Sequence, residues 1–454
     1  MLGSVLLLII KLIETRTIPS QRYYPPPSRI SLSPTVFQRR GTPTPSPTPL
    51  PPTPTPPVNV PELSIPQEEV LFDKIYGDNI YAYSLSTDNN FSVYRKTLNG
   101  QIEGIFNNSS AEGNVRRFYS QIRIDISPDN QKIAYSSDTG IYIYELQSKE
   151  TKRLIKLKER ADPNSERPNK WSNETESQTF SFYGLGPVSW SSDEKYISFV
   201  TSNWEGVGQG IVNTTTSEIV FPVIKDLNYG AGGFGYRWSP KGHQFLKYNA
   251  DEGYQQPGLF ISVNNGSFDL TDITAQLKKL ESQSPESWLV GVLDANFSHM
   301  KNNVVFVYDP LGTHSYNANG QLTLKTQTKL GVIDIYGIGL TILLTGNITK
   351  SQFYPNDDSI LFIQQYPAFQ VLSRYSISSK NIEHLLKIKN DEFAITDMEW
   401  LDENTLILKG DIKILDSNRV DNSIQRFILV NLSEKKVVYA SPELESFNFL
   451  GFVD

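Results

Sequence analysis

The chain has 454 residues, a net charge of −7 and no cysteine, a length that fits one large domain with a tail or two to three ordinary domains. The lack of cysteine excludes disulfides, thiolate metal sites and a cysteine nucleophile. An acidic chain is poorly suited to nucleic acid, because phosphate binding needs a basic surface. Tyr and Phe number 23 each, which favours half-buried strands and predicts a β-rich fold.

Residues 1–14 form an apolar N-terminal segment that is too short to cross a bilayer and lacks the basic start and cleavage site of a complete signal peptide. We expect it to be part of a signal anchor that attaches the protein to a membrane; the alternative is an apolar N-terminus with no such role. Six basic residues against one Glu14 accompany the segment between Lys11 and Arg40. The positive-inside tendency would keep such a segment in the cytoplasm, which opposes the simplest orientation.

Residues 15–66 are a Pro/Thr-rich linker that we expect to be disordered. Nine of the sixteen residues Thr42–Pro57 are proline. This stretch, called the stalk below, should stay extended as polyproline II at about 3.1 Å per residue, or roughly 50 Å. A spacer is favoured over an SH3 or WW ligand, because no basic anchor lies beside the prolines. The remaining body, residues 67–454, is distinctly acidic.

One pattern recurs through the body: an anchor residue that is aromatic or Ile, a polar turn, and an alternating strand that ends in an apolar residue. The clearest copies are Ile126-Ser-Pro-Asp-Asn-Gln-Lys-Ile-Ala-Tyr135, Trp190-Ser-Ser-Asp-Glu-Lys-Tyr-Ile-Ser-Phe199 and Trp238-Ser-Pro-Lys-Gly-His-Gln-Phe-Leu-Lys-Tyr248. Weaker copies begin at Phe297, Phe353 and Trp400. Each copy predicts an antiparallel pair joined by a tight turn, and two further strands follow in most copies.

Four-stranded units repeated in this way indicate the blades of a β-propeller. The stretches 79–83, 91–95 and 101–106 supply three strands of a first blade that has no strand of its own to begin it. The apolar C-terminal stretch Phe447–Val453 has no partner of its own. If it becomes the innermost strand of the first blade, the ring closes and an exposed edge disappears. Six anchors and this composite blade predict an all-β propeller of seven blades at residues 67–454, with six as the alternative.

The unit at 126–144, Ile-Ser-Pro-Asp followed by Ile-Ala-Tyr and Gly-Ile-Tyr-Ile-Tyr, resembles the repeat of TolB-like and WD-repeat-like β-propellers, and the weaker copies extend the resemblance across roughly 120–410. The resemblance implies a propeller that serves as a docking platform, often outside the cytoplasm. The sequence departs from TolB in its seven expected blades, in its stalk, and in lacking an obvious separate N-terminal α/β domain.

Loop lengths predict which face of the ring is functional. On one face of the ring lie the links between strands one and two and between strands three and four of each blade. These links are short, and we call this face the short-turn face. The opposite face, the long-loop face, receives the insertions Lys158–Gly186, Thr201–Gly210, Asn228–Phe234, Asn249–Pro257, Asp272–Ser287 with a short helix, and Asp309–Lys329. Because rigid scaffolds place recognition on loops, we expect the binding site there.

Aromatic side chains within these insertions or directly beside them are the candidate binding residues, since they supply interface hot spots and sugar-stacking surfaces. The alternative is that they only pin long loops to the blades. The predicted binding residues are Trp171, Trp204, Tyr229, Tyr254, Trp288 and Tyr316.

A search for catalytic motifs finds no nucleophile elbow, no His-Glu-x-x-His and no sialidase box. The four histidines are not expected to converge, and we predict no metal and no cofactor, with calcium on an acidic loop as the alternative. Carboxylates such as Asp251, Asp309 and Asp402 could pair in space. The pair Asp357-Asp358 is interpreted as a polar turn.

The sequence therefore predicts a non-catalytic, monomeric binding module, held away from a membrane by the stalk, that recognises a protein or a cell-envelope glycan. We expect it in the cell envelope, anchored with an extracytoplasmic propeller, or secreted. The alternatives are an extracellular hydrolase or lyase that uses carboxylates at the mouth of the central channel, and a structural envelope protein. Converging acids in the channel would favour the enzyme.

Overall fold

The computed structural model divides the chain into two compact units, Met1–Thr53 and Pro54–Asp454, and every described residue lies in the second. The predicted segment at 1–14 and most of the linker, including nearly all of the stalk, lie outside the described residues. The structure describes residues 57, 59–66, 80–86, 91–97, 102–115, 123–160, 170–173, 184–203, 206–220, 236–249, 258–262, 268, 270–282, 291–312, 315–316, 322–323, 327–412, 424–441, 444–445 and 447–453.

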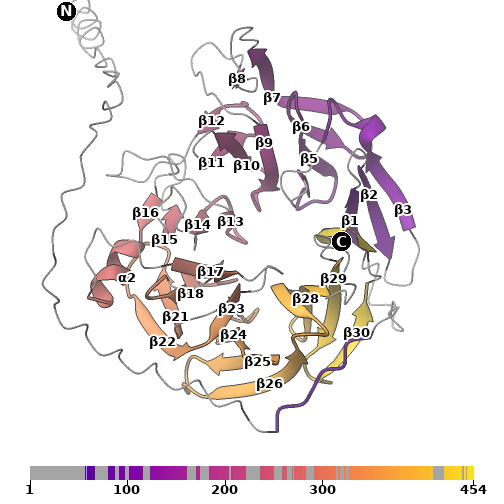
Figure 1. Cartoon of the computed structure of the whole chain (residues 1–454). Helices are drawn as coiled ribbons and strands as arrows, with labels where there is room; N and C mark the ends of the chain where they lie inside the picture. The colour runs from indigo at the N-terminus through magenta and orange to yellow at the C-terminus, as the bar shows by residue number, and fades with distance from the viewer. Residues whose placement is uncertain are drawn as a thin grey trace, which may run out of the picture. The chain divides into compact units, whose positions relative to one another are not determined.

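Seven antiparallel sheets, each built on four strands, form the blades of a β-propeller (Figure 1). This confirms the predicted all-β fold and the blade count of seven. Blade 1 is composite, with β32 (Phe447–Val453) beside β1 (Ile80–Ser86), β2 (Phe91–Thr97) and β3 (Ile102–Asn107), which is followed by the short 3₁₀ helix η1 (Asn108–Ser110).

The other six blades are consecutive in the chain. Blade 2 contains β4 (Ile124–Ile126), β5 (Lys132–Ser136), β6 (Gly140–Glu145), β7 (Thr151–Arg160) and the additional β8 (Lys170–Asn173). Blade 3 contains β9 (Gly184–Trp190), β10 (Tyr196–Asn203), β11 (Gly206–Asn213) and β12 (Ile219–Val220). Blade 4 contains β13 (Tyr236–Trp238), β14 (Phe245–Asn249), β15 (Gly258–Ser262) and β16 (Leu270–Asp272).

Blades 5 to 7 complete the ring. Blade 5 contains β17 (Gly291–Phe297), β18 (Asn303–Asp309), β21 (Thr328–Asp334) and β22 (Thr341–Gly346). Blade 6 contains β23 (Ile348–Phe353), β24 (Ser359–Gln365), β25 (Phe369–Ser376) and β26 (Ile382–Lys389). Blade 7 contains β27 (Ala394–Trp400), β28 (Thr405–Ile412), β29 (Ile424–Asn431) and β30 (Lys436–Ala440), and β31 (Leu444–Glu445) also pairs with β29.

The C-terminal strand closes the ring as the sequence predicts. β32 runs antiparallel to β1, from the pair Ile80↔Val453 to the pair Leu85↔Phe447, with one irregularity after Ala82. It occupies the innermost position of blade 1, which β4 and β9 occupy in blades 2 and 3. The two ends of the propeller are therefore joined by backbone hydrogen bonds within one sheet, which removes a free sheet edge.

The repeated anchor motif folds as a tight turn between the first two strands of a blade. In blade 2, Asn130 donates its backbone N–H to the carbonyl of Ser127 at 2.8 Å, and Lys132 donates its backbone N–H to the Ser127 hydroxyl at 2.9 Å. Asn130 adopts a φ of 58°, a conformation that asparagine tolerates. The Ser-Pro-Asp sequence thus supplies both the turn geometry and the partners of its own backbone.

The hydrophobic core is divided into layers between neighbouring blades. One cluster joins blades 2 and 3 through residues such as Ile143 and Phe199, and another joins blades 4 and 5 through Leu259 and Phe306. A third cluster, between blades 6 and 7, includes Leu63 from the N-terminal side of the propeller. Further clusters join blades 1 and 2, blades 3 and 4, and blades 5 and 6, so each of blades 2 to 6 packs against both of its neighbours.

One predicted insertion is wrong. Residues Thr201–Gly210 are mostly strand, because β10 continues to Asn203 and β11 begins at Gly206, which leaves a link of two residues. Gly210 lies against the ring of Phe199, whose Cζ would be 2.3 Å from an added Cβ, so a strand glycine is required there by close packing.

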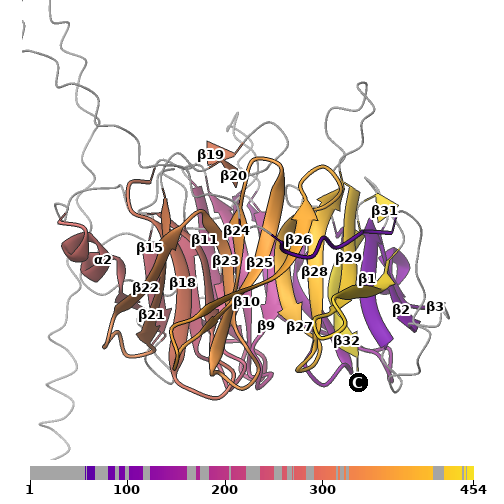
Figure 2. The ribbon, with the colours of Figure 1, turned by 90° about the horizontal axis from the view of Figure 1, so that it is seen from below.

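Two other insertions contain regular structure. The short helix expected within Asp272–Ser287 is present as α2 (Thr274–Leu280). The insertion Asp309–Lys329 contains a small hairpin of β19 (Ser315–Tyr316) and β20 (Leu322–Thr323), seen at the top of Figure 2. Within the described ranges, no helix has the length and apolar character needed to cross a membrane.

Candidate functional site

The predicted aromatic binding residues fall largely outside the described part of the chain. Trp204, Tyr229, Tyr254 and Trp288 are not among the described residues. The backbone of Trp171 lies in β8, opposite Glu159 of β7, and that of Tyr316 lies in β19, opposite Leu322 of β20. The long-loop binding site therefore stays a prediction.

A charged cluster lies instead at the axis of the ring, on the inner strands of the blades. Three of its residues come three positions before an anchor residue, and three come one position before an anchor. Because strand side chains alternate, positions one and three before an anchor share one side of the strand. The six residues are Asp294, Lys350 and Asp397 in the first set and Asp125, Arg237 and Glu399 in the second.

Arg237 of β13 is the centre of this axial cluster. Its Nη2 atom lies 3.1 Å from Oδ1 of Asp397 on β27 and 3.4 Å from Oδ1 of Asp294 on β17. Its Nε donates to the hydroxyl of Tyr248 at 3.4 Å. Arg237 and Asp397 belong to blades 4 and 7, which are not neighbours in the ring (Figure 1). Their contact therefore links two inner strands that blades 5 and 6 separate in the chain.

Asp294 is the most enclosed member, with a side chain only 1% exposed. Its Oδ2 accepts hydrogen bonds from the backbone N–H of Ser351 at 2.9 Å and from Nδ2 of Asn296 at 3.1 Å. The ammonium of Lys350 lies 3.7 Å from its other oxygen. Arg237 and Asp397 remain partly accessible, at 27% and 35% of the side chain. The end of the cluster at Asp294 is therefore buried, whereas the end at Asp397 is partly accessible to solvent.

The charges in this cluster stabilise one another. Burial alone would raise the pKa of Asp397, but the positive charges of Arg237, Lys409 and Lys350 outweigh it and hold the pKa well below its ordinary value. Burial would lower the pKa of Lys350, and nearby Asp294 instead raises it. The ammonium of Lys409 is paired with Glu399 at 3.1 Å. Asp397 therefore stays ionised at neutral pH and is a poor proton donor.

Asp125 of β4 behaves differently from Asp397. Burial raises its pKa to about 7, although its Oδ2 accepts the backbone N–H of Trp190 at 2.8 Å and its Oδ1 accepts the N–H of Ile126 at 3.0 Å. The negative charge of Glu399, on β27 of blade 7, also raises this pKa. The surroundings of Asp125 therefore favour its protonated form near neutral pH, in contrast to those of Asp397.

Sequence reasoning missed all of these axial residues. The acids singled out from the sequence were Asp251, Asp309, Asp357, Asp358 and Asp402. Asp251 is outside the described residues, while Asp309 and Asp402 accept hydrogen bonds from nearby backbone N–H groups. The available signal was positional: a charged residue lies one or three positions before five of the six anchors, Trp190 being the exception.

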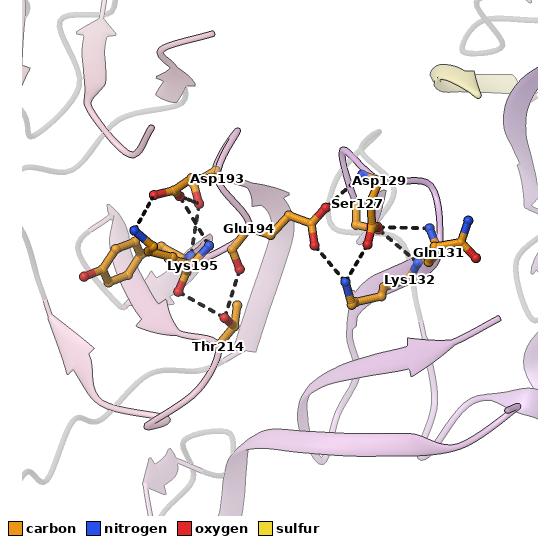
Figure 3. Close-up of polar contacts among 10 residues, drawn as sticks. Ser127, Asp129, Gln131, Lys132, Asp193, Glu194, Lys195 and Thr214 are labelled. Carbon is orange, nitrogen blue, oxygen red and sulfur yellow. Dashed lines mark hydrogen bonds and ion pairs between the residues drawn. The ribbon is translucent and has the colours of Figure 1, made fainter. Parts of the chain in front are cut away.

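The short-turn face is held together by ties between neighbouring anchor turns (Figure 3). Glu194 of blade 3 accepts the backbone N–H of Asp129 of blade 2 at 2.8 Å and pairs with the ammonium of Lys132 at 2.7 Å. Nδ1 of His243 is hydrogen-bonded to Asp193 at 2.9 Å, which joins blades 4 and 3. These contacts confirm that the short links are structural turns.

The described histidines have structural partners as well. The backbone N–H of His299, in the turn after β17, donates to Asp357 at 2.8 Å. His384 lies within β26, the outer strand of blade 6, with Nδ1 2.9 Å from the Ser373 hydroxyl. His314 is outside the described residues. In the part of the chain that the structure describes, no group of three or more potential ligands could hold a metal ion.

Comparison with solved structures reports a likeness of fold at low sequence identity. TolB from Acinetobacter baumannii is 17% identical over 67% of this chain, with a TM-score of 0.34, and the match spans 63% of the TolB chain. A manganese complex of oligogalacturonate lyase is 10% identical, covering 78% and 83% of the two chains, with a TM-score of 0.41.

The periplasmic gluconolactonase PpgL of Pseudomonas aeruginosa is 10% identical, covering 83% of this chain and 99% of its own, with a TM-score of 0.46. No protein-family model matches the sequence, and no curated protein matches it.

Proposed function

We propose that the protein is a non-catalytic binding module, held away from a membrane on its stalk, that recognises a protein or a cell-envelope glycan through its long-loop face. The contact between Arg237 and Asp397 carries this proposal. It places a cation between the inner strands of blades 4 and 7, at the axis where a propeller enzyme would bind its substrate, and pairs that cation with a carboxylate.

The electrostatics of the axial cluster support the same conclusion. A general acid needs a pKa near the working pH, and its partner base needs to be free to accept a proton. Asp397 has a lowered pKa and is paired with Arg237, while Asp294 has two hydrogen-bond donors and two cations around it. Such a network fixes blades relative to one another, and the resemblance of the repeat to TolB-like docking platforms points the same way.

One observation favours a second candidate function, the hydrolase or lyase. Asp125, with a pKa of about 7, would serve as the acid, and Glu399, 54% exposed, would serve as the base. This function predicts that Asp125→Asn abolishes turnover of an acidic or neutral envelope polysaccharide, whereas a binding module gives no turnover in the parent protein.

The binding proposal is tested with the full chain and a variant in which Trp171, Trp204, Tyr254 and Trp288 are changed to Ala. Co-sedimentation with purified cell-wall glycan and crosslinking to envelope proteins are measured separately. The matched control is Tyr336→Ala, an aromatic 57% exposed in the turn between β21 and β22 on the opposite face. We expect the fourfold variant to lose the partner and the control to retain it. Equal capture by all three proteins would refute the long-loop site.

A further inference from the structure

A short segment between the stalk and the first strand is fastened to the outside of the propeller. We call residues Pro61–Pro66 the strap; Figure 2 shows it in indigo, crossing the sheets of blades 6 and 7. Glu62 pairs with Lys387 of β26 as a parallel bridge. Leu63 donates its backbone N–H to the carbonyl of Lys387 at 2.8 Å, and Lys387 donates its own to the carbonyl of Pro61 at 2.8 Å. The strap therefore pairs alongside β26, the outer strand of blade 6. The part of the chain that packs on the propeller begins before residue 67.

Side chains reinforce this pairing. The carboxylate of Glu62 lies 2.9 Å from the ammonium of Lys387 and 2.9 Å from that of Lys389. These two cations lower the pKa of Glu62 to about 2, so the pairs persist at any physiological pH. Leu63 is 2% exposed and packs in the hydrophobic cluster shared by blades 6 and 7.

The far end of the strap is fixed on blade 7. Arg426 of β29, only 1% exposed, donates from Nη1 to the carbonyl of Pro66 and from Nε to the carbonyl of Ser441. Ile65 packs against the same cluster as Leu63. The strap thus contacts two blades along its length, through backbone bonds, ion pairs, a buried leucine and a buried arginine.

The position of the strap in the chain gives these contacts a mechanical meaning. Tension applied to the stalk passes through residues 61–66 before it can reach β1, which begins at Ile80. β1 pairs with β32, and among the described blades this is the only sheet that combines strands from the two ends of the propeller. If the strap releases, the pull falls on the strand that closes the ring.

We propose that the strap is the mechanical anchor of the stalk. It directs tension into blades 6 and 7 and shields the closing pair of β1 and β32. This inference rests on the proposed tethering function. Contacts spread along a segment pulled lengthwise share the load, whereas a strand pulled from one end loses its bonds one at a time. The strap's contacts are spread from Pro61 to Pro66, which suits it to the first kind of loading.

The test is single-molecule stretching of the full chain. The parent has no cysteine, so Thr42→Cys and Lys241→Cys give two unique attachment points. Lys241 is exposed in the turn between β13 and β14, so the pull does not act on β32 directly. We expect a first rupture that lengthens the chain by at most roughly 65 Å, the extended length of the segment from Pro61 to β1. Opening of blade 1 should follow as a separate, later event.

Two variants decide the outcome. Leu63→Asp with Glu62→Gln should eliminate the first rupture and bring the opening of blade 1 forward, while the exposed neighbour Ser64→Ala should leave the trace unchanged. Glu62→Gln alone, which leaves the core intact, should lower the first rupture force and make it less sensitive to salt. Identical traces for the parent and the double variant, with matching thermal unfolding, would overturn the anchor. Because partner capture involves no force, that result would leave the binding proposal standing.

Discussion

Arg237 on blade 4 donates a hydrogen bond at 3.1 Å to Asp397 on blade 7, which lies 160 residues later in the chain. The same nitrogen faces Asp294 on blade 5 at 3.4 Å. One guanidinium therefore links three blades at the axis, in addition to the apolar layers that join neighbouring blades at their faces. Removing this cation should therefore destabilise all three blades together.

Replacing Arg237 by Met should destabilise the fold by about 3 kcal/mol, because it leaves the nearly buried Asp294 with less compensation for its charge. Denaturant unfolding followed by tryptophan fluorescence measures this loss. The matched control is Asp397→Asn, which removes the other partner of Arg237. Since Asp397 is 35% exposed, its loss should cost about 1 kcal/mol or less. Equal losses in the two variants would show that Asp294 does not depend on Arg237.

The architecture could be predicted from the sequence because each blade carries a local signal. The serine after each of Ile126 and Trp190 accepts two backbone N–H groups of its own turn, one on its carbonyl and one on its hydroxyl, so a short local sequence specifies the turn. The closure by Phe447–Val453 could be predicted by counting strands. The first blade had no first strand of its own, and the C-terminal strand had no partner, so pairing the two completes the blade.

The axial cluster could not be predicted in the same way. Arg237 meets Asp397 only because the ring brings blade 4 opposite blade 7, and no local pattern encodes which inner strands face each other. The strap was missed for a related reason. Glu62 and Leu63 follow the proline-rich stretch and were grouped with it, while their partner Lys387 lies on a distant outer strand.

Stability should fall as the pH rises from about 4 to about 7, through the titration of Asp125. Its pKa is about 7 in the folded protein and about 4 in an unfolded chain, so within this window the folded state binds a proton that the unfolded state has released. The free energy of unfolding then decreases with pH, by up to about 4 kcal/mol, and is constant above the folded pKa.

Asp125→Asn keeps an oxygen for the N–H of Trp190 and should flatten the pH profile between 4 and 7. Asp397→Asn is the control of opposite sign. Its pKa is lowered by folding, so its contribution is present above the unfolded pKa and disappears as the pH falls below about 4. Thermal melts across the range would contradict the assignment if Asp125→Asn retained the parent slope.

The neighbours Asp357 and Asp358 should differ sharply in importance. Asp357 is fully buried and accepts the backbone N–H groups of His299, Met300 and Lys301 at 2.8, 2.6 and 2.8 Å. Asp357→Asn offers only one oxygen to these three donors and should cost about 3 kcal/mol. Asparagine also tolerates the φ of 56° at this position, so the loss reports the hydrogen bonds and not backbone strain.

Asp358→Asn is the matched control for that substitution. Its side chain is 58% exposed and 3.8 Å from Arg374, an arrangement worth little in water, so the change should stay within about 0.5 kcal/mol. Urea unfolding of both variants gives the comparison. Similar stabilities would mean that the hydrogen bonds from the blade 5 turn to Asp357 in the blade 6 turn contribute nothing to the free energy of unfolding.

Deleting residues 447–454 should prevent the propeller from closing. The deletion removes all of β32 and leaves the inner edge of β1 without its partner from Ile80 to Leu85. An unpaired edge of this length exposes backbone donors and acceptors to other chains, so we expect aggregation and loss of the cooperative thermal transition. Size-exclusion chromatography and calorimetry measure both effects. Adding the peptide 444–454 in excess should restore part of the transition, because the strand can bind from outside. A deleted chain that stays monomeric and melts like the parent would show that the closing pair is dispensable, and the strap would then have nothing to protect.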